Sequence, residues 1–220
     1  MTESVMGDPP LGVSLEEECA IFEDITGGLP TEGTEEGTPG DDVIEDAGGV
    51  GLIDLKTGSD TLTVTEDTGE IQGRSGDDDV MIEANVGTIE LGNGDDSLTG
   101  EGLVETVLTG NGNDTVDITG SIKDLRTGGG DDNVTVSGNL HDANLGRGNN
   151  TLVVEGLAGS IKSGGGVDDV TVMQGAEVVA LGGGDDILRV GDLVGLASGG
   201  AGFDTIVFDF NAGDFDVKVR

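Results

Sequence analysis

Aromatic residues, cysteine and histidine are nearly absent from this chain of 220 residues, which has no Trp, no Tyr and a single cysteine, Cys19. One cysteine leaves no pair for an internal disulfide. With 2% aromatic residues, a globular core built around large rings is excluded, whereas a thin core of stacked aliphatic side chains is not. No apolar stretch is long enough to cross a bilayer, so the sequence predicts no membrane span.

Positive charge is also scarce, since 9 Lys and Arg face 45 Asp and Glu and give a formal net charge of -36. A chain of this charge would be repelled by a phosphate backbone, so we expect no nucleic-acid partner. The balance favours a cation as partner, or a solvated disordered chain. The first residues, Met1 to Asp8, contain no basic segment followed by an apolar run, so no N-terminal secretory signal is expected.

Catalytic motifs are missing as well. The only histidine is His141, and the chain contains neither an H-E-x-x-H zinc motif nor a G-x-S-x-G nucleophile turn. We therefore predict that the protein is not an enzyme.

An 18-residue repeat organises most of the chain. One column of this repeat is glycine ten times out of ten: Gly40, Gly58, Gly76, Gly94, Gly112, Gly130, Gly148, Gly166, Gly184 and Gly202. Two residues later stand nine aspartates and one asparagine: Asp42, Asp60, Asp78, Asp96, Asp114, Asp132, Asn150, Asp168, Asp186 and Asp204. Two residues further on, every coil has Ile, Leu or Val, from Ile44 to Ile206.

Each column has a physical reason. Glycine permits the backbone conformation of a tight turn, and aspartate supplies a hard anionic oxygen. The aliphatic residue begins a strand, and alternation then directs Val64, Ile82, Ile118, Val136, Val154, Val172 and Val190 to the same inward face. A second strand follows a plain turn and carries apolar pairs such as Val86 with Ile89. A solvated low-complexity linker would not keep aliphatic residues in phase over ten periods.

The sequence therefore predicts an all-β fold, a right-handed parallel β-roll or β-solenoid of about ten 18-residue coils. We expect three regions: a mostly disordered acidic tail over residues 1–36, the solenoid over 37–208, and a C-terminal cap or edge segment over 209–220. The cap is expected because an open solenoid end exposes core and strand edge, and four of the five phenylalanines lie near it.

Stacking brings the aspartates of neighbouring coils close together, and this like-charge column opposes folding unless a cation compensates it. Carboxylate and backbone carbonyl oxygens suit Ca²⁺ better than Mg²⁺, and zinc would require Cys or His ligands. The alternative is that these aspartates only shape turns. We predict one row of several Ca²⁺ ions as cofactor, at Asp42, Asp60, Asp78, Gly92, Gly94, Asp96, Gly110, Gly112, Asp114, Gly128, Gly130, Asp132, Gly164, Gly166, Asp168, Gly182, Gly184, Asp186, Gly200, Gly202 and Asp204.

The segment Gly182-Gly183-Gly184-Asp185-Asp186-Ile187-Leu188 resembles the nonapeptide G-G-x-G-x-D-x-U-x of repeats-in-toxin, or hemolysin-type calcium-binding repeat, proteins. The resemblance covers residues 38–208. It implies a β-roll that holds Ca²⁺ between coils, export without an N-terminal signal, an extracellular location, and folding on contact with external calcium. Only alternate nonapeptides keep the motif here, which is why we expect one row of ions.

Three coils depart from the motif at the second glycine of the turn, where Thr38, Lys56 and Arg74 stand instead. Positive charge at Lys56 and Arg74 predicts weak or empty sites there. In the seventh coil, Asn149 and Asn150 replace two acids next to Arg147. We expect the Arg147 guanidinium to replace calcium and to pair with Asp132 or Asp168.

Two further functions remain open. One is an adhesive, surface-layer or ice-binding solenoid that uses calcium only as a staple. Its flat outward face would carry Thr61, Thr63, Thr99, Thr115, Thr135, Thr151, Thr171 and Thr205. The other is a module of a larger exported or surface assembly, joined by attachment or by end-to-end self-association.

Overall fold

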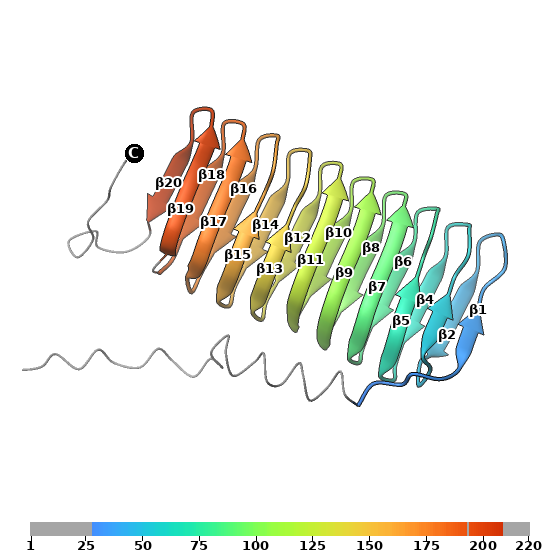
Figure 1. The fold of residues 1–220 in the computed structure, drawn as a ribbon. Helices are drawn as coiled ribbons and strands as arrows, with labels where there is room; N and C mark the ends of the chain where they lie inside the picture. Colours follow the sequence, from blue (N-terminus) through green and yellow to red (C-terminus); the bar gives the residue numbers. More distant parts are fainter. Residues whose placement is uncertain (1–27, 193, 209–220) are drawn as a thin grey trace, which may run out of the picture.

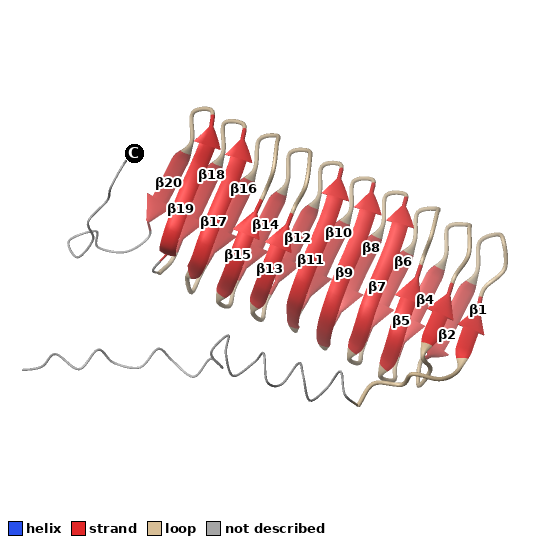
Figure 2. Ribbon diagram, viewed as in Figure 1, coloured by secondary structure: helices blue, strands red, loops and turns tan. Residues whose placement is uncertain are grey.

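Two parallel sheets, connected by a turn at each edge, make up the protein (Figure 1). The computed structural model describes residues 28–192 and 194–208, and within these residues every regular element is a strand (Figure 2). In the same residues no helix is long and apolar enough to cross a membrane. The predicted all-β parallel solenoid of about ten 18-residue turns is confirmed.

The odd-numbered strands form one ten-stranded sheet, here called sheet A. Its strands are β1 (Thr34–Glu36), β3 (Leu52–Asp54), β5 (Thr68–Gln72), β7 (Val86–Asn93), β9 (Leu103–Asn111), β11 (Ser121–Gly129), β13 (Leu140–Asn144), β15 (Ala158–Lys162), β17 (Ala176–Gly183) and β19 (Val194–Ala201).

The even-numbered strands form the facing ten-stranded sheet, sheet B. Its strands are β2 (Val43–Ala47), β4 (Thr61–Val64), β6 (Asp79–Ile82), β8 (Ser97–Gly100), β10 (Thr115–Ile118), β12 (Asn133–Val136), β14 (Thr151–Val154), β16 (Asp169–Val172), β18 (Ile187–Val190) and β20 (Thr205–Phe208).

Sheet A begins at Thr34, ahead of the predicted solenoid start at residue 37. Residues 1–27 of the predicted tail and the predicted cap over 209–220 lie outside the described residues.

The 18-residue period of the sequence is the register of the sheets. Val116 pairs with Val134, and Leu125 pairs with Ala143, so each residue faces the one a single period further along the chain. The register shifts only between β2 and β4, where Ala47 faces Val64. Identical spacing therefore stacks like residues into ladders, which turns each column of the sequence into a row in space.

The core lies between the sheets, and the predicted inward residues fill it. Val64, Ile82, Ile118, Val136, Val154, Val172 and Val190 are at most 1% exposed, as are Leu62, Val80, Leu98, Val116, Val134, Leu152, Val170 and Leu188. Sheet A contributes Ile53, Ile71, Ile89, Val107, Leu125, Ile161 and Val179, all fully buried. Burial of these ladders drives the folding of the solenoid, because each fully buried Val, Leu or Ile contributes about 1.5–3 kcal/mol.

Glycine is required at the turns that precede the aspartates of the row, except at Gly40 in the first turn, where a Cβ would meet no other atom. Gly112 has φ +138°, and a Cβ there would overlap the carbonyl oxygen of Gly94 in the preceding coil. The same overlap recurs from Gly76 to Gly202, which explains the unbroken glycine column.

The described N-terminal segment, which begins at Gly28, lies across glycines of sheet A. A Cβ on Gly69 would come within 2.6 Å of the Pro30 carbonyl oxygen, and one on Gly87 within 3.2 Å of Leu29 Cδ1. These glycines therefore leave the room that this segment occupies.

Candidate metal site

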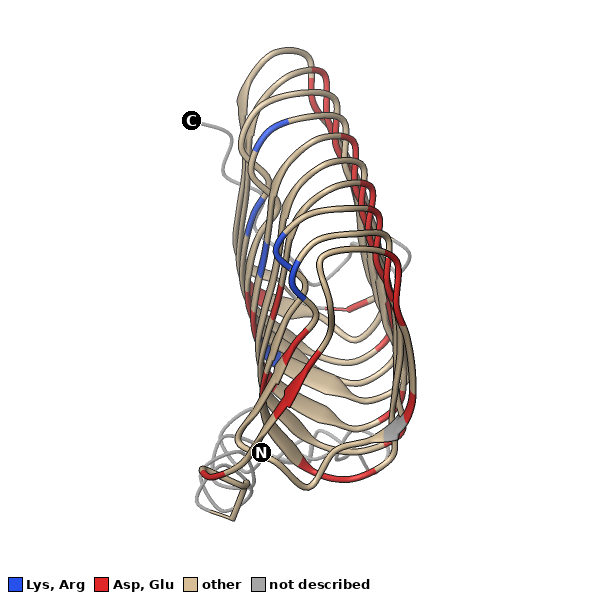
Figure 3. Cartoon of the chain, turned by 90° about the vertical axis from the view of Figure 1, so that its right-hand side faces the viewer, with Lys and Arg blue, Asp and Glu red and all other residues tan. Residues whose placement is uncertain are grey.

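The regular spacing of the aspartates produces an inner row, the column Asp42 to Asp204 with Asn150, at the turns from sheet A to sheet B. Figure 3 shows acidic residues gathered along one edge of the solenoid. The central side chains of the row are at most 2% exposed: Asp60, Asp78, Asp96, Asp114, Asp132, Asn150, Asp168 and Asp186. The predicted carboxylates thus come together in one row, but they are buried inside the turn rather than displayed at the surface.

From Asp60 to Asp204, one oxygen of each carboxylate in this row accepts a hydrogen bond from the neighbouring coil. The backbone N–H of Asp78 donates to Oδ1 of Asp96 at 2.9 Å, and the N–H of Asp96 donates to Oδ1 of Asp114 at 2.9 Å. The same bond links every consecutive pair from Asp42 to Asp204. Each aspartate therefore closes the turn of the preceding coil.

The second oxygen of these carboxylates has no hydrogen-bond partner. This holds for buried Oδ2 atoms of Asp60, Asp78, Asp96, Asp114, Asp132, Asp168 and Asp186. A buried acceptor without a donor costs about 1–3 kcal/mol, and more when the group is charged. The seven oxygens need either a proton or a cation.

Asn150 shows what these oxygens face. Its Nδ2 donates to the carbonyl oxygen of Gly148 at 3.2 Å. Because carboxylate and amide have the same shape, we infer that the equivalent Oδ2 of an aspartate lies near the equivalent glycine carbonyl, which would place two acceptors together. Facing carboxylate and carbonyl oxygens form a donor set that suits a hard divalent cation such as Ca²⁺.

Burial makes these carboxyls weak acids. Burial, with smaller contributions from the charges of neighbouring aspartates, raises the pKa of Asp78 to about 6 and that of Asp96 to about 7, although the backbone hydrogen bond opposes it. Burial likewise raises the pKa values of Asp60, Asp114, Asp132 and Asp186. The nearby Thr109 and Thr127 hydroxyls oppose the rise in pKa at Asp114 and Asp132, but both hydroxyls donate to backbone carbonyls, so the Oδ2 atoms stay without a hydrogen bond. The ionised row is therefore unfavourable without compensation.

The first residue of each turn packs beside the inner row, a feature that the sequence analysis missed. This column holds buried leucines at Leu55, Leu91, Leu145 and Leu181, and buried hydroxyl residues at Thr109, Thr127 and Ser163. The Thr109 hydroxyl donates to the Thr127 carbonyl at 3.0 Å, and the Thr127 hydroxyl donates to the Leu145 carbonyl at 2.8 Å. Alternation from the inward column two residues earlier predicts this orientation. The turns of Asp114 and Asp132 are consequently richer in oxygen than those with leucine.

A second, outer row of short polar side chains runs beside the first. Oδ1 of Asp77 accepts from the N–H of Asp95 at 2.9 Å, and Oδ1 of Asp95 accepts from the N–H of Asn113 at 2.7 Å. These bonds run in the opposite sense to those of the inner row. The outer side chains are exposed or partly exposed, so water can solvate their second oxygen. The sequence signal was the column of Asp, Asn and Ser, interrupted by Val167 and Phe203, that directly precedes the inner column.

The predicted glycine ligands lie in the same turns. The first predicted glycine of each turn has φ between +92° and +113°, at Gly92, Gly110, Gly128, Gly164, Gly182 and Gly200. The second has φ between +134° and +144°, at Gly94, Gly112, Gly130, Gly166, Gly184 and Gly202.

The two ends of the inner row, Asp42 and Asp204, are less buried than the other members, and the N–H and hydroxyl of Thr38 both donate to Asp42. Among the described residues no group of three or more His, Cys, Asp or Glu forms a metal cluster, so a cation here would draw most ligands from the backbone.

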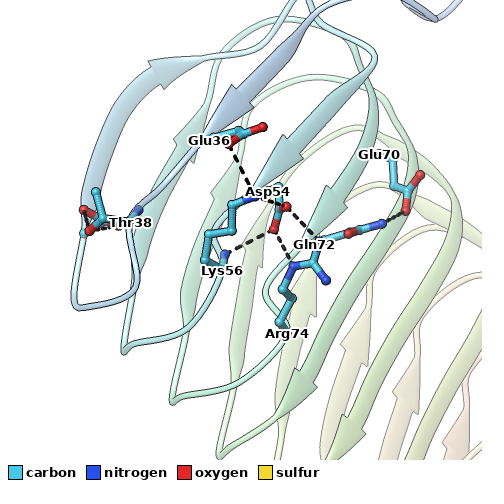
Figure 4. Close-up of polar contacts among 8 residues, drawn as sticks. Glu36, Thr38, Asp54, Lys56, Glu70, Gln72 and Arg74 are labelled. Carbon is cyan, nitrogen blue, oxygen red and sulfur yellow. Dashed lines mark hydrogen bonds and ion pairs between the residues drawn. The ribbon is translucent and has the colours of Figure 1, made fainter.

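Lys56 and Arg74 do not lie at the inner row, contrary to expectation. Their backbones have φ +78° and +72°, and their side chains turn onto sheet A to contact Asp54 (Figure 4). Arg74 Nε and Nη2 donate to Asp54 at 2.6 and 2.7 Å, Lys56 Nζ donates to it at 2.6 Å, and Lys56 also pairs with Glu36 at 3.4 Å. We call these four residues the ion-pair clamp. It joins the first three coils without a metal.

Removing the central carboxylate should weaken the first coils. The Arg74 guanidinium, and then the Lys56 ammonium, hold the pKa of the Asp54 carboxyl well below its usual range against the effect of burial. Asp54→Asn would leave the Arg74 guanidinium without its carboxylate partner and Lys56 with only the longer contact to Glu36, on residues that already have unfavourable positive φ, and we expect the unfolding temperature to fall by several degrees. Thermal unfolding measures it. The exposed pair of Arg126 with Asp124 provides the control, since Asp124→Asn should change little; equal losses would contradict a special role for Asp54.

Arg147 does not pair with Asp132 or Asp168, so that expectation was wrong. The Oδ2 atoms of both aspartates lack a partner, and their side chains are buried inside the turn. Arg147 is exposed at the outside of the turn, where it lines a groove together with Gly129 and Gly165. The compensation in this coil comes from the Asn150 amide instead.

Comparison of the chain with protein-family models, with curated proteins and with solved structures found no match.

Proposed function

We propose that this chain is a secreted calcium-binding repeat protein or module, of the repeats-in-toxin kind, which folds on binding extracellular Ca²⁺. The observation that carries the proposal is the row of seven buried carboxylate oxygens without a hydrogen-bond partner. Ca²⁺ accepts six to eight oxygens in flexible geometry, which matches carboxylates and turn carbonyls from adjacent coils. The ion would stabilise the fold by neutralising the row and by satisfying its oxygens.

Folding would depend on the location of the protein because the free calcium concentration differs inside and outside cells. A ligand that binds only the folded state stabilises it by an amount that grows with its free concentration. Calcium is scarce in a cytosol and abundant outside cells, so the ionised row would disfavour folding before export and the metal would favour it afterwards. No catalytic role is part of this proposal.

The adhesive or ice-binding alternative has weaker support. Thr61, Thr63, Thr135 and Thr171 do lie on the outer side of sheet B, but the same face carries 40% exposed Met81 and the ion pair of Arg189 with Asp169. A uniform, flat threonine surface is therefore interrupted.

Calcium stoichiometry tests the proposal in matched variants. Asp96→Asn replaces the carboxylate oxygen that lacks a hydrogen-bond partner with an amide N–H donor, as Asn150 does in the seventh coil. This change should lower the number of bound ions by at least one. Asn150→Asp restores the row and should raise it. Isothermal titration with CaCl₂, with MgCl₂ as control, measures both. Absence of calcium binding at millimolar concentration, or a stoichiometry that neither variant changes, would overturn the proposal.

A further inference from the structure

The first residue of each turn borders the free oxygen of the inner row, and the turns that begin with glycine show where its side chain would lie. A Cβ on Gly73 would be 2.4 Å from Oδ2 of Asp78 and 2.5 Å from the carbonyl oxygen of Leu91 in the next coil. The equivalent two oxygens lie within 2.9 Å of a Cβ on Gly37 in the first turn. A side chain at this position therefore begins beside one carboxylate oxygen and one carbonyl oxygen.

In four turns, here called the leucine turns, this side chain is apolar and offers no ligand. The leucines are fully buried, at Leu55, Leu91, Leu145 and Leu181. Five residues later the inner row has Asp60, Asp96, Asn150 and Asp186, respectively. A cation in a leucine turn would have to draw its protein ligands from the carboxylate and the backbone alone.

In three turns, here called the hydroxyl turns, the first residue carries a buried hydroxyl. These turns pair Thr109 with Asp114, Thr127 with Asp132, and Ser163 with Asp168. Each hydroxyl donates to the carbonyl of the first residue in the next coil, which for Thr127 is the Leu145 carbonyl at 2.8 Å.

The hydroxyl oxygen of such a turn can still act as a ligand. A hydroxyl has one hydrogen and two lone pairs, so the donation to the carbonyl leaves lone pairs on the oxygen. The Thr127 hydroxyl lies near the carboxyl of Asp132, whose buried Oδ2 has no hydrogen-bond partner. The hydroxyl turns therefore gather a carboxylate oxygen, a hydroxyl oxygen and backbone carbonyls.

We propose that the hydroxyl turns hold the tightest calcium sites of the row, with the hydroxyl oxygens of Thr109, Thr127 and Ser163 as ligands, and that they fill before the leucine turns. This inference rests on the proposed function and assigns an order to its sites. Ca²⁺ accepts six to eight oxygens, so a turn with one more protein oxygen needs less water to complete the shell. Water is scarce in these turns, because their aspartates are at most 2% exposed.

The competing explanation is that the hydroxyls only fix the backbone of the next coil. Thr127→Val and Thr127→Ser separate the two roles, since valine has nearly the shape of threonine without the hydroxyl, and serine keeps the hydroxyl. A purely structural role would lower stability in Thr127→Val without changing the order in which ions leave.

Ordered release of calcium tests the inference. Calcium-loaded protein is dialysed against buffers of decreasing free calcium, retained ions are counted by atomic emission, and far-ultraviolet circular dichroism reports whether the fold persists. Thr127→Val should lose one of the last ions at a free calcium concentration about tenfold higher than the parent or more. Thr127→Ser should release its ions as the parent does.

A gain of binding gives the converse test. Leu91→Thr places a hydroxyl in the turn of Asp96 and should add one ion to those released last. Leu145→Thr is the matched control, because it makes the same change in the turn of Asn150, which has no carboxylate, and should add none. The Thr127 variants decide the matter should Leu91→Thr not fold.

The outcomes separate this inference from the proposed function. A parent chain that retains no calcium at any concentration would overturn both. A parent that binds calcium, with identical release from Thr127→Val and Thr127→Ser, would overturn this inference alone. Release of all ions in a single step would do the same.

Discussion

In the presence of a chelator, the folded protein should be more stable at pH 5 than at pH 8. Burial raises the pKa values of Asp78 and Asp96 to about 6 and about 7, whereas the unfolded chain has ordinary values near 3.9. A carboxyl whose pKa is higher in the folded state favours folding while it is protonated. That contribution is fully present below about pH 4 and is lost as pH rises through 6 to 7.

Each unit of pKa displacement corresponds to roughly 1.4 kcal/mol, so the two residues together should shift the melting temperature by several degrees. The β signal of far-ultraviolet circular dichroism in chelator at pH 5, 6, 7 and 8 measures the folded fraction, and thermal unfolding measures the shift at each pH where the metal-free protein is folded. The measurement is repeated in a His141→Gln variant, which contains no histidine. Higher stability at pH 8 than at pH 5 in that variant would contradict the assignment.

Replacing four central aspartates of the inner row with asparagine should make folding much less dependent on calcium. Asn150 already shows that the amide donates to the turn carbonyl that an aspartate can only oppose. One variant removes four carboxylate oxygens that lack a hydrogen-bond partner by changing Asp78, Asp96, Asp114 and Asp132 to Asn. If each costs even about 1 kcal/mol, the metal-free melting temperature should rise by about 10 °C or more.

The outer row gives a matched control for this substitution. Changing Asp77, Asp95, Asp131 and Asp185 to Asn removes the same charge from exposed or partly exposed positions whose Oδ1 acceptors are kept. We expect this variant to retain the calcium dependence of the parent. If both variants gained the same stability in chelator, general charge repulsion rather than the buried oxygens would explain the effect.

The sequence was sufficient for the fold because the period fixes the register. An 18-residue spacing aligns Val116 with Val134 and Asp96 with Asp114, and strand alternation then assigns the inward face. The same columns located the candidate site. They could not show that one carboxylate oxygen closes the preceding turn while the other stays without a partner, because that depends on side-chain rotamers within the turn.

The basic residues of the turns show this limit most clearly. Lys56 and Arg74 occupy glycine positions, and the sequence places their charge near the aspartates. Their positive φ values instead direct the side chains onto sheet A, toward Asp54, which belongs to a column with no regular pattern. Arg147 likewise lies one residue from a turn glycine, yet on the outside of the turn. Proximity along the chain does not decide which side of a turn a side chain takes.

The most direct test of the account is a titration of calcium-free protein with CaCl₂ at pH 7.5, followed by far-ultraviolet circular dichroism, with MgCl₂ as control. The account predicts a cooperative gain of β signal with calcium and little with magnesium at the same concentration. A full β spectrum that neither chelator nor calcium changes would contradict it, and would mean that the aliphatic ladders suffice and that the aspartates only shape the turns.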